Sequence, residues 1–253
     1  MLIDRHAEIV ELARREGGVV VEDLASRFAV SVQTIRKDLN ELTGRGTLKR
    51  VHGGAVYPSS VENMEYEARR RIAATQKDAI GQAAARLIPN DASVFLNIGT
   101  TTEAVAQCLS GHSGLMVITN NINVANRLRI YPGIEVVIAG GVVRASDGGI
   151  VGEAAVDFFR QFKADYAVVG ASAIDAEGAL LDFDFREVKV AQAIIANARH
   201  VVLVADSSKF ERTAPVRIGH LSAIGTFVTD ACPPAIRRMC AKSDVRLIET
   251  GIR

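Results

Sequence analysis

The chain has 253 residues, of which 48% are hydrophobic and 23% charged, and its formal net charge is +1, values typical of a globular protein with a sizeable core. The net charge alone gives no sign of a nucleic-acid partner, and no apolar run approaches the roughly 18 residues that span a bilayer. Because charged residues occur within the first six positions, we expect no secretory signal, no membrane contact and a cytoplasmic location.

The beginning of the chain, residues 1–57, is predicted to form three short helices and a β-hairpin. The first helix covers 4–16 and ends at a glycine pair, and a short β-branched strand follows at 19–21. The second helix covers 22–28 and has one apolar face. A tight turn then leads to Ser31, whose hydroxyl has the position and chemistry of an N-cap for the third helix.

The third helix combines an apolar face with a polar one. Apolar residues recur at helical spacing and are expected to face the core, namely Val32, Ile35, Leu39 and Leu42. The opposite face carries amide, hydroxyl and cationic groups, which hydrogen-bond base edges and phosphates in a major groove. We therefore predict a recognition helix whose DNA-binding residues are Ser31, Gln33, Thr34, Arg36, Lys37 and Asn40.

A basic β-hairpin is predicted directly after this helix, over residues 47–56. The basic residues around it are Arg27, Arg36, Lys37, Arg45, Lys49 and Arg50, against only Asp38 and Glu41. Such a local patch attracts phosphate backbones even in a nearly neutral chain. A basic hairpin after a recognition helix is typical of a wing that contacts the DNA backbone or minor groove. The hairpin adds Lys49, Arg50 and His52 to the candidate DNA-binding residues and completes a predicted winged helix-turn-helix with operator DNA as its partner.

Residues 58–76 lose this pattern, and we interpret them as a linker leading into a helix. Pro58-Ser59-Ser60 breaks the chain, and an acidic stretch precedes Arg69-Arg70-Arg71. From 77 to 253, near-continuous apolar strands alternate with helices. The predicted strands are 93–98, 116–119, 135–139, 166–170, 200–205, 224–228 and 246–249, and the helices include 102–109, 123–129, 152–162, 187–198 and 234–242. This alternation predicts an α/β domain with a mostly parallel sheet that is covered on both faces.

Polar loops follow four of the predicted strands. The loop at Gly99 opens a helix, where a sharp glycine turn, threonine hydroxyls and free N–H groups bind an anion without a cationic side chain. Ligands of open parallel sheets bind outside the carboxyl ends of the strands, and Lys209 supplies a compact positive charge for phosphate. We therefore expect a small phosphorylated ligand bound by Asn97, Gly99, Thr100, Thr101, Thr102, Asn120, Asn121, Gly140, Gly141, Asp175 and Lys209. The loops at 146–153 and 182–187 are either lids over this pocket or plain surface.

The cysteines and histidines give no sign of a metal or a cofactor. The cysteines have no metal-ligand spacing and are interpreted as reduced apolar side chains: Cys108, Cys232 and Cys240. The five histidines are scattered along the chain. We expect no metal site and no cofactor.

The motifs and their order along the chain resemble those of the DeoR family of transcriptional repressors. The resemblance is carried by residues 31–39, 52–55, 98–101, 119–121, 139–141 and 206–210 and so covers nearly the whole chain. It implies a homo-oligomeric repressor of a carbohydrate or glycerol catabolic regulon, released from its operator by a phosphorylated metabolite. The residues at 33–36, 58–60, 120–126 and 147–154 make glycerol 3-phosphate the favoured effector. One departure is Asn97, where the family usually has Asp, so the pocket lacks a carboxylate.

The second domain also resembles the ribose-5-phosphate isomerase fold, which gives an alternative function: an isomerase-like enzyme with a DNA-binding appendage. Those enzymes carry an Asp-Gly-Ala-Asp-Glu run whose carboxylates transfer the proton, and the matching stretch here, 169–173, lacks both aspartates. Proton transfer next to a carbonyl needs a positioned base, and Glu187 alone remains as a candidate. We therefore expect no catalysis. A third interpretation, a DNA-architectural protein whose second domain only oligomerises, is disfavoured by the clustered polar loops.

Overall fold

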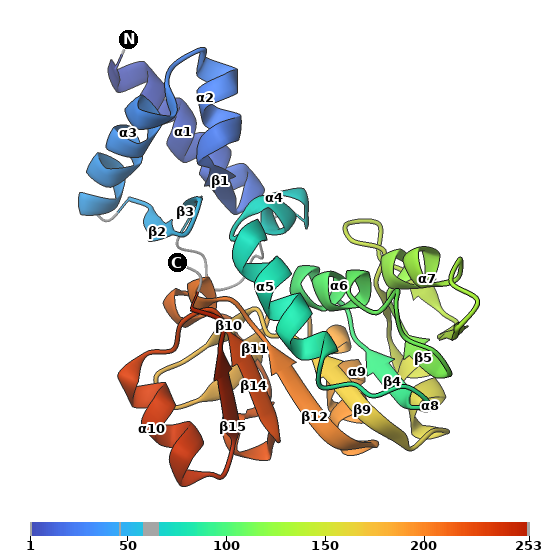
Figure 1. Ribbon diagram of the computed structural model, residues 1–253. Coiled ribbons are helices and arrows are strands. Elements are labelled where there is room, and N and C mark those ends of the chain that lie inside the picture. Colours follow the sequence, from blue (N-terminus) through green and yellow to red (C-terminus); the bar gives the residue numbers. More distant parts are fainter. Residues whose placement is uncertain (1, 46, 58–65, 252–253) are drawn as a thin grey trace.

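The computed structural model describes residues 2–45, 47–57 and 66–251 and contains two domains (Figure 1). The smaller domain consists of α1 (Leu2–Glu16), β1 (Gly18–Val20), α2 (Val21–Phe28), α3 (Val32–Gly44), β2 (Lys49–Val51) and β3 (Gly54–Val56). Its strands pair antiparallel in the order β1-β3-β2. The three predicted helices and the hairpin are confirmed, whereas the predicted break at 58–60 lies outside the described residues.

Apolar side chains at helical spacing build the core of the smaller domain. Ile9 of α1, Leu24 of α2 and Ile35 of α3 are buried in one cluster. Helix α3 begins as predicted, because the Ser31 hydroxyl accepts the backbone N–H of Thr34 at 3.1 Å. A cap of this kind stabilises a helix by about 1 kcal/mol. The cap and the buried stripe together determine which side of α3 is exposed.

The larger domain is built around a seven-stranded parallel sheet. Its main elements are α5 (Ala74–Ala85), β4 (Ser93–Leu96), α6 (Thr100–Gln107), β5 (Leu115–Thr119), α7 (Ile122–Leu128), β6 (Ile134–Ile138), α8 (Glu153–Arg160), β9 (Ala164–Val169), α9 (Phe185–Ala196), β12 (Ala198–Val204), β14 (Thr226–Thr229), α10 (Pro234–Lys242) and β15 (Arg246–Glu249). The strand order is β15-β14-β12-β9-β4-β5-β6, and each neighbouring pair is parallel. The predicted strands and the parallel α/β class are confirmed.

Helices cover both faces of this sheet because its central strands are apolar on both sides. Along β4, Val94 and Leu96 belong to one buried cluster and Phe95 belongs to the other. The first cluster is completed by α5, α6 and α7, and the second by α8, α9 and α10 (Figure 1). This alternation is the period of two expected of a strand that is buried on both faces.

Several short elements near the carboxyl ends of the strands are not predicted by the sequence. They are the antiparallel pair β7 (Val142–Val143) and β8 (Ile150–Val151), the small sheet of β10 (Ala173–Ile174), β11 (Ala179–Asp182) and β13 (Val216–His220), and the 3₁₀ turns η1 (Ser207–Glu211) and η2 (Leu221–Ala223). The elements of two or three residues, β7, β8, β10 and η2, are too brief to display a hydrophobic period. Both predicted loops include parts of regular elements. The loop at 146–153 runs through β8 into α8, and the loop at 182–187 runs from β11 into α9.

Helix α4 (Tyr66–Arg71) lies between the two domains and within the predicted linker (Figure 1). An apolar cluster joins its end to the small sheet and consists of Val20, Val51, Val56, Ala68, Ile72 and Ala73. Arg71 also forms an ion pair with Asp23 of α2. The division into 1–57, 58–76 and 77–253 stays a prediction, but the described part of the middle segment is a structured contact between the domains.

Candidate functional site

The outer face of α3 presents most of the residues that the sequence predicts for DNA contact. Its exposed members are Gln33, Arg36, Lys37 and Asn40. Thr34 is half-buried, and its hydroxyl lies 2.8 Å from that of Ser31, so this pair also holds the start of the helix. Amide and cationic groups on one exposed helix face can hydrogen-bond base edges and neutralise phosphates.

An ion pair beneath α3 attaches this helix to α1. Arg5 donates to Asp38 at 2.7 and 3.0 Å, and the ring of His6 lies 3.1 Å from the same carboxylate. Burial opposes ionisation of Asp38, but the hydrogen bonds from Arg5 and His6 outweigh it and lower the pKa of this carboxyl group. The sequence shows Asp38 only as an acidic residue in a basic patch, because its partners precede it by 33 and 32 positions.

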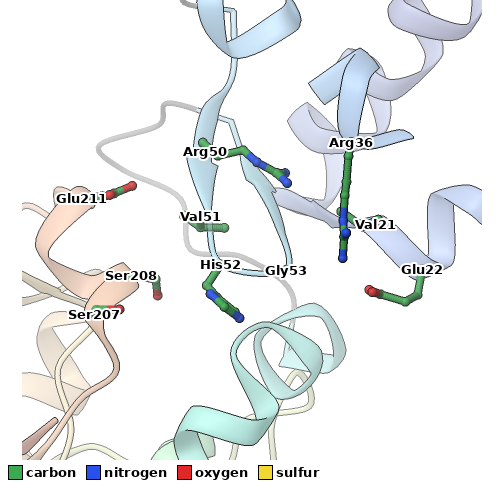
Figure 2. Close-up of a pocket in the computed structure, with 10 residues that line it drawn as sticks. All are labelled: Val21, Glu22, Arg36, Arg50, Val51, His52, Gly53, Ser207, Ser208 and Glu211. Atoms are coloured by element: carbon green, nitrogen blue, oxygen red, sulfur yellow. The ribbon is translucent and has the colours of Figure 1, made fainter. Parts of the chain in front are cut away.

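The wing turns part of its basic surface toward the larger domain. Lys49 is exposed, whereas Arg50 is half-buried and donates to the carbonyl of Gly54 at 2.6 Å. Burial and the nearby charge of Arg36 lower the pKa of Arg50. Figure 2 shows both arginines beside an open cleft of about 600 Å³, which residues of η1 in the larger domain also line.

The turn of the wing contacts the larger domain directly. The ring of His52 points toward α5 (Figure 2), and its Nε2 lies 2.8 Å from the side-chain nitrogen of Gln76. In this arrangement His52 serves the contact between the domains. Its predicted role in DNA binding, like that of Arg50, stays a prediction.

The second candidate site begins at the loop between β4 and α6. Gly99 has a φ of +149°, which favours glycine, and it turns the chain so that α6 begins at Thr100. The hydroxyl of Thr102 donates to the carbonyls of Asn97 and Gly99, at 2.8 and 2.7 Å, and so holds the loop in shape. The free N–H groups in the first turn of α6 favour a bound anion, and Thr101 is available beside them.

This loop lines a small cavity, called here the anion pocket. Its walls also include 170–172 after β9, Lys209 of η1, Asp182, Glu187 and Arg69 of α4. The cavity encloses about 30 Å³, which is room for about two water molecules.

Positive charge is crowded beside the anion pocket. Burial lowers the pKa of Lys209 to about 7; Asp206 opposes this shift, while Arg212 and Lys77 add to it. Burial likewise lowers the pKa of Arg212 to about 10 and also lowers that of Lys77. Asp206 opposes all three shifts, Asp182 also opposes that of Arg212, and Glu103 also opposes that of Lys77. A bound anion would relieve the mutual repulsion of these cations.

Carboxyl groups line the same pocket. Burial and the neighbouring Asp182 raise the pKa of Glu187 to about 8, although Arg144 donates to Glu187 at 2.6 Å. Arg144 also donates to Asp147, at 2.9 and 2.7 Å, and to Asp184 at 3.1 Å. The carboxyl groups at 182 and 187 can form hydrogen bonds with hydroxyl groups of a ligand.

Some predicted ligand-binding residues do not line the pocket: Asn97, Asn120, Asn121, Gly140, Gly141 and Asp175. Asn121 caps α7 by accepting the N–H of Asn123 at 2.9 Å. Asp175 closes the turn between β10 and β11 by accepting the N–H groups of Glu177 and Ala179. Local capping therefore accounts for these two side chains, and Gly140 and Gly141 are exposed after β6.

Asn97 and Asn120 are buried next to polar loops without complete hydrogen bonding. Among the described residues, the side-chain oxygen of each has no hydrogen-bond partner. An unpartnered buried acceptor costs about 1–3 kcal/mol, so a buried water is its expected partner.

The sequence does not predict the roles of Arg69, which lines this pocket, or of Arg144, which donates to the pocket residue Glu187. Arg69 belongs to a basic run in the predicted linker, and Arg144 lies in the loop between β7 and β8. A charged run usually indicates a solvated surface, and no local pattern distinguishes these two side chains from other arginines.

The described ranges contain no cluster of metal-ligating side chains. Within the same ranges, no helix is long and apolar enough to cross a membrane. The three cysteines, Cys108, Cys232 and Cys240, are free thiols.

Both parts of the chain match known domains. Residues 5–61 match the DeoR-like helix-turn-helix domain, and residues 72–231 match the DeoR C terminal sensor domain. The chain is 47% identical to a glycerol-3-phosphate regulon repressor of Escherichia coli (strain K12), over 91% of each chain. It is 46% identical to a glycerol-3-phosphate regulon repressor of Haemophilus influenzae, over 96% of this chain and 95% of the relative.

Parts of the chain are also similar to solved structures. The chain is similar to ribose 5-phosphate isomerase A from Methanocaldococcus jannaschii, with 15% identity, 55% of each chain covered and a TM-score of 0.41. It is also similar to a translation initiation factor eIF-2B from Pyrococcus horikoshii, with 18% identity, 60% and 61% of the two chains covered and a TM-score of 0.42.

Proposed function

Because this chain belongs to the DeoR family of transcriptional repressors, we propose that it represses a carbohydrate or glycerol catabolic regulon and that glycerol 3-phosphate releases it from its operator. The outer face of α3 reads the operator, and the anion pocket binds the effector. The relatives that are 46–47% identical over nearly their whole length are named as repressors, so the alternative of an isomerase with a DNA-binding appendage is set aside.

The composition of the anion pocket carries this proposal. The start of α6 and the buried Lys209 favour a phosphate group. Asp182 and Glu187 line the same pocket and favour hydroxyl groups over a second acidic group. A small polyol monophosphate meets both requirements, and glycerol 3-phosphate offers one phosphate and two hydroxyls. The names of the relatives support the same effector.

The proposed binding to operator DNA depends on the exposed face of α3 and on the association of two or more copies of the chain. Gln33, Lys37 and Asn40 are exposed on one helix face and are available to base edges. We infer that the protein acts as a homo-oligomer, so that two copies of α3 enter successive major grooves, about 34–36 Å apart.

The test is fluorescence anisotropy of a labelled operator fragment bound to the full chain, titrated with candidate effectors. Glycerol 3-phosphate and 3-phosphoglycerate share a skeleton, but the second carries a carboxylate that Asp182 would repel. We expect release by glycerol 3-phosphate at a concentration at least about tenfold lower than by 3-phosphoglycerate. Glycerol without phosphate serves as the control and should not release the operator.

Other outcomes discriminate between the parts of the proposal. Release by fructose 1-phosphate alone would keep the repressor and its pocket but replace the effector. Equal release by glycerol 3-phosphate and 3-phosphoglycerate would contradict the assignment of the carboxyl groups to the ligand's hydroxyls. Equal binding to operator and random DNA would contradict the recognition-helix assignment.

A further inference from the structure

Three consecutive arginines of α4 reach three different surroundings. Arg70 is exposed and pairs within its own helix. Arg71 pairs with Asp23 of the smaller domain. Arg69 lines the anion pocket and pairs with Asp147 at 3.2 Å. One short helix therefore contacts the candidate effector site and the DNA-binding domain at adjacent positions.

The hydrogen bonding of Arg69 is incomplete. Its Nη2 donates to Asp147, while its Nε is buried and has no hydrogen-bond partner among the described residues. Asp147 does not depend on Arg69, since Arg144 donates to it twice and the N–H of Gly149 donates at 3.2 Å. Arg69 can therefore move away from Asp147 and leave this carboxylate with its other hydrogen-bond partners. A phosphate can accept two parallel hydrogen bonds from a guanidinium group. Such a pair is stronger than the single long hydrogen bond that Arg69 donates to Asp147.

The anion pocket must open before it can hold a polyol phosphate. Its volume of about 30 Å³ is far below that of such a ligand. The walls at 99–102, 170–172 and Lys209 lie where the chain leaves β4, β9 and β12 of the central sheet, and they include the first turn of α6 and part of η1. Of the described residues that line the pocket, Arg69 alone comes from the segment that precedes α5; all the others belong to the larger domain. Displacement of Arg69 and its helix is therefore the least disruptive way to make room.

Contacts at both ends of α4 make its position depend on the larger domain. At the start of the helix, the Tyr66 hydroxyl donates to Glu103 of α6 at 2.6 Å. At the end, the buried Lys77 donates to the carbonyls of Arg69 and Ile72, the second at 2.7 Å. Lys77 is one of the cations beside the anion pocket, so charge introduced there acts on the end of α4 as well.

The other side of α4 belongs to the smaller domain. The apolar cluster around Ile72 includes residues of β1, β2 and β3, and Arg71 pairs with Asp23. Figure 1 shows α4 directly beneath this domain. A shift of the helix therefore moves the small sheet and the wing, which also contacts the larger domain through His52.

We propose that Arg69 is a direct ligand of the effector's phosphate, paired with Asp147 in the unliganded chain, and that its transfer to the phosphate repositions α4 and the DNA-binding domain. This inference rests on the proposed function and adds to it the residue that couples the two sites. The effector then favours the arrangement in which Arg69 contacts phosphate, because only a ligand with unequal affinity for two states shifts their populations.

The test compares Arg69→Gln with Arg70→Gln, a matched control on the same helix, in the full chain. Affinities for glycerol 3-phosphate and for inorganic phosphate are measured by calorimetry, and hydrogen exchange of residues 67–72 is followed with and without glycerol 3-phosphate. We expect Arg69→Gln to bind both ligands at least about tenfold more weakly, with no change in exchange on adding glycerol 3-phosphate. Arg70→Gln should bind both ligands like the parent and show the parent's exchange response.

Circular dichroism and thermal unfolding establish that the variants are folded, and Arg69→Lys provides a second variant. The lysine keeps the charge but loses the planar fork, so its affinity should lie between those of the parent and Arg69→Gln. Parent-like affinity in both Arg69 variants would overturn the proposal, and so would a parent whose α4 exchange does not respond to the ligand. If the parent binds glycerol 3-phosphate through Arg69 but keeps its operator, the proposed function fails and the ligand assignment stands.

Discussion

Replacement of Lys209 by methionine tests whether a buried lysine neutralises the effector's phosphate. Lys209 is buried beside Asp206, and burial lowers its pKa to about 7. Methionine has a similar length and no charge, so it removes the electrostatic contact and keeps most of the packing. A charge-assisted hydrogen bond contributes about 1.5–3 kcal/mol, so the variant should bind glycerol 3-phosphate about 10- to 150-fold more weakly near pH 7.

The pH dependence of the parent follows from the same pKa. The phosphate requires the ammonium form of Lys209, whose population falls about 50-fold between pH 7 and pH 9 for a pKa of about 7. Glu187, with a pKa of about 8 that burial and Asp182 have raised, becomes charged over the same range and repels the phosphate. Both effects weaken effector binding as the pH rises. Lys209→Arg stays charged and should retain only the part of this dependence that comes from Glu187.

The assay is calorimetry with glycerol 3-phosphate between about pH 6.5 and pH 9, a range in which the phosphate remains largely a dianion. Lys242→Met removes an exposed lysine at the end of α10 and is the matched control, with parent-like affinity expected throughout. A parent-like affinity in Lys209→Met at pH 7 would refute the contact. A parent affinity that does not change with pH would refute the titration argument.

Three further predictions concern DNA binding, the smaller domain and catalysis. Gln33→Ala should reduce the preference for operator over random DNA by about 1–3 kcal/mol. Arg36→Ala should weaken binding to operator and to random DNA alike and make the affinity less dependent on salt concentration. Anisotropy at several salt concentrations measures both effects. Asp38→Asn should lower the free energy of unfolding of the smaller domain by about 3 kcal/mol in thermal or urea melts, because it breaks a largely buried pair with Arg5. Folding lowers the pKa of Asp38, so the pair stabilises the domain at pH values above the ordinary pKa of Asp. This stabilisation is lost as the pH falls below that value. A coupled assay with ribose 5-phosphate should give no turnover above background; a rate that disappears in Glu187→Gln would contradict this.

The sequence alone determined the elements and their class. Val94 and Phe95 of β4 lie in neighbouring positions and enter different buried clusters, and this local alternation of apolar residues is what predicted a sheet covered on both faces. The Ser31 cap and the apolar stripe through Ile35 and Leu39 are likewise properties of residues within two turns of one another. They predict the start of α3 and its exposed face, and with them most of the candidate DNA-binding residues.

Only the tertiary structure decided which polar residues meet in the anion pocket. Asp175 and Gly99 are both predicted to bind the ligand, yet Asp175 closes a hairpin turn, while Arg69 reaches the pocket from a segment interpreted as a linker. His52 belongs to a basic wing by sequence and contacts α5 in the fold. The physical reason is distance along the chain: hydrophobic period, capping and turn chemistry act over a few residues. The partners of Arg69 and His52 lie 78 and 24 positions away and are brought close only when the two domains pack around α4.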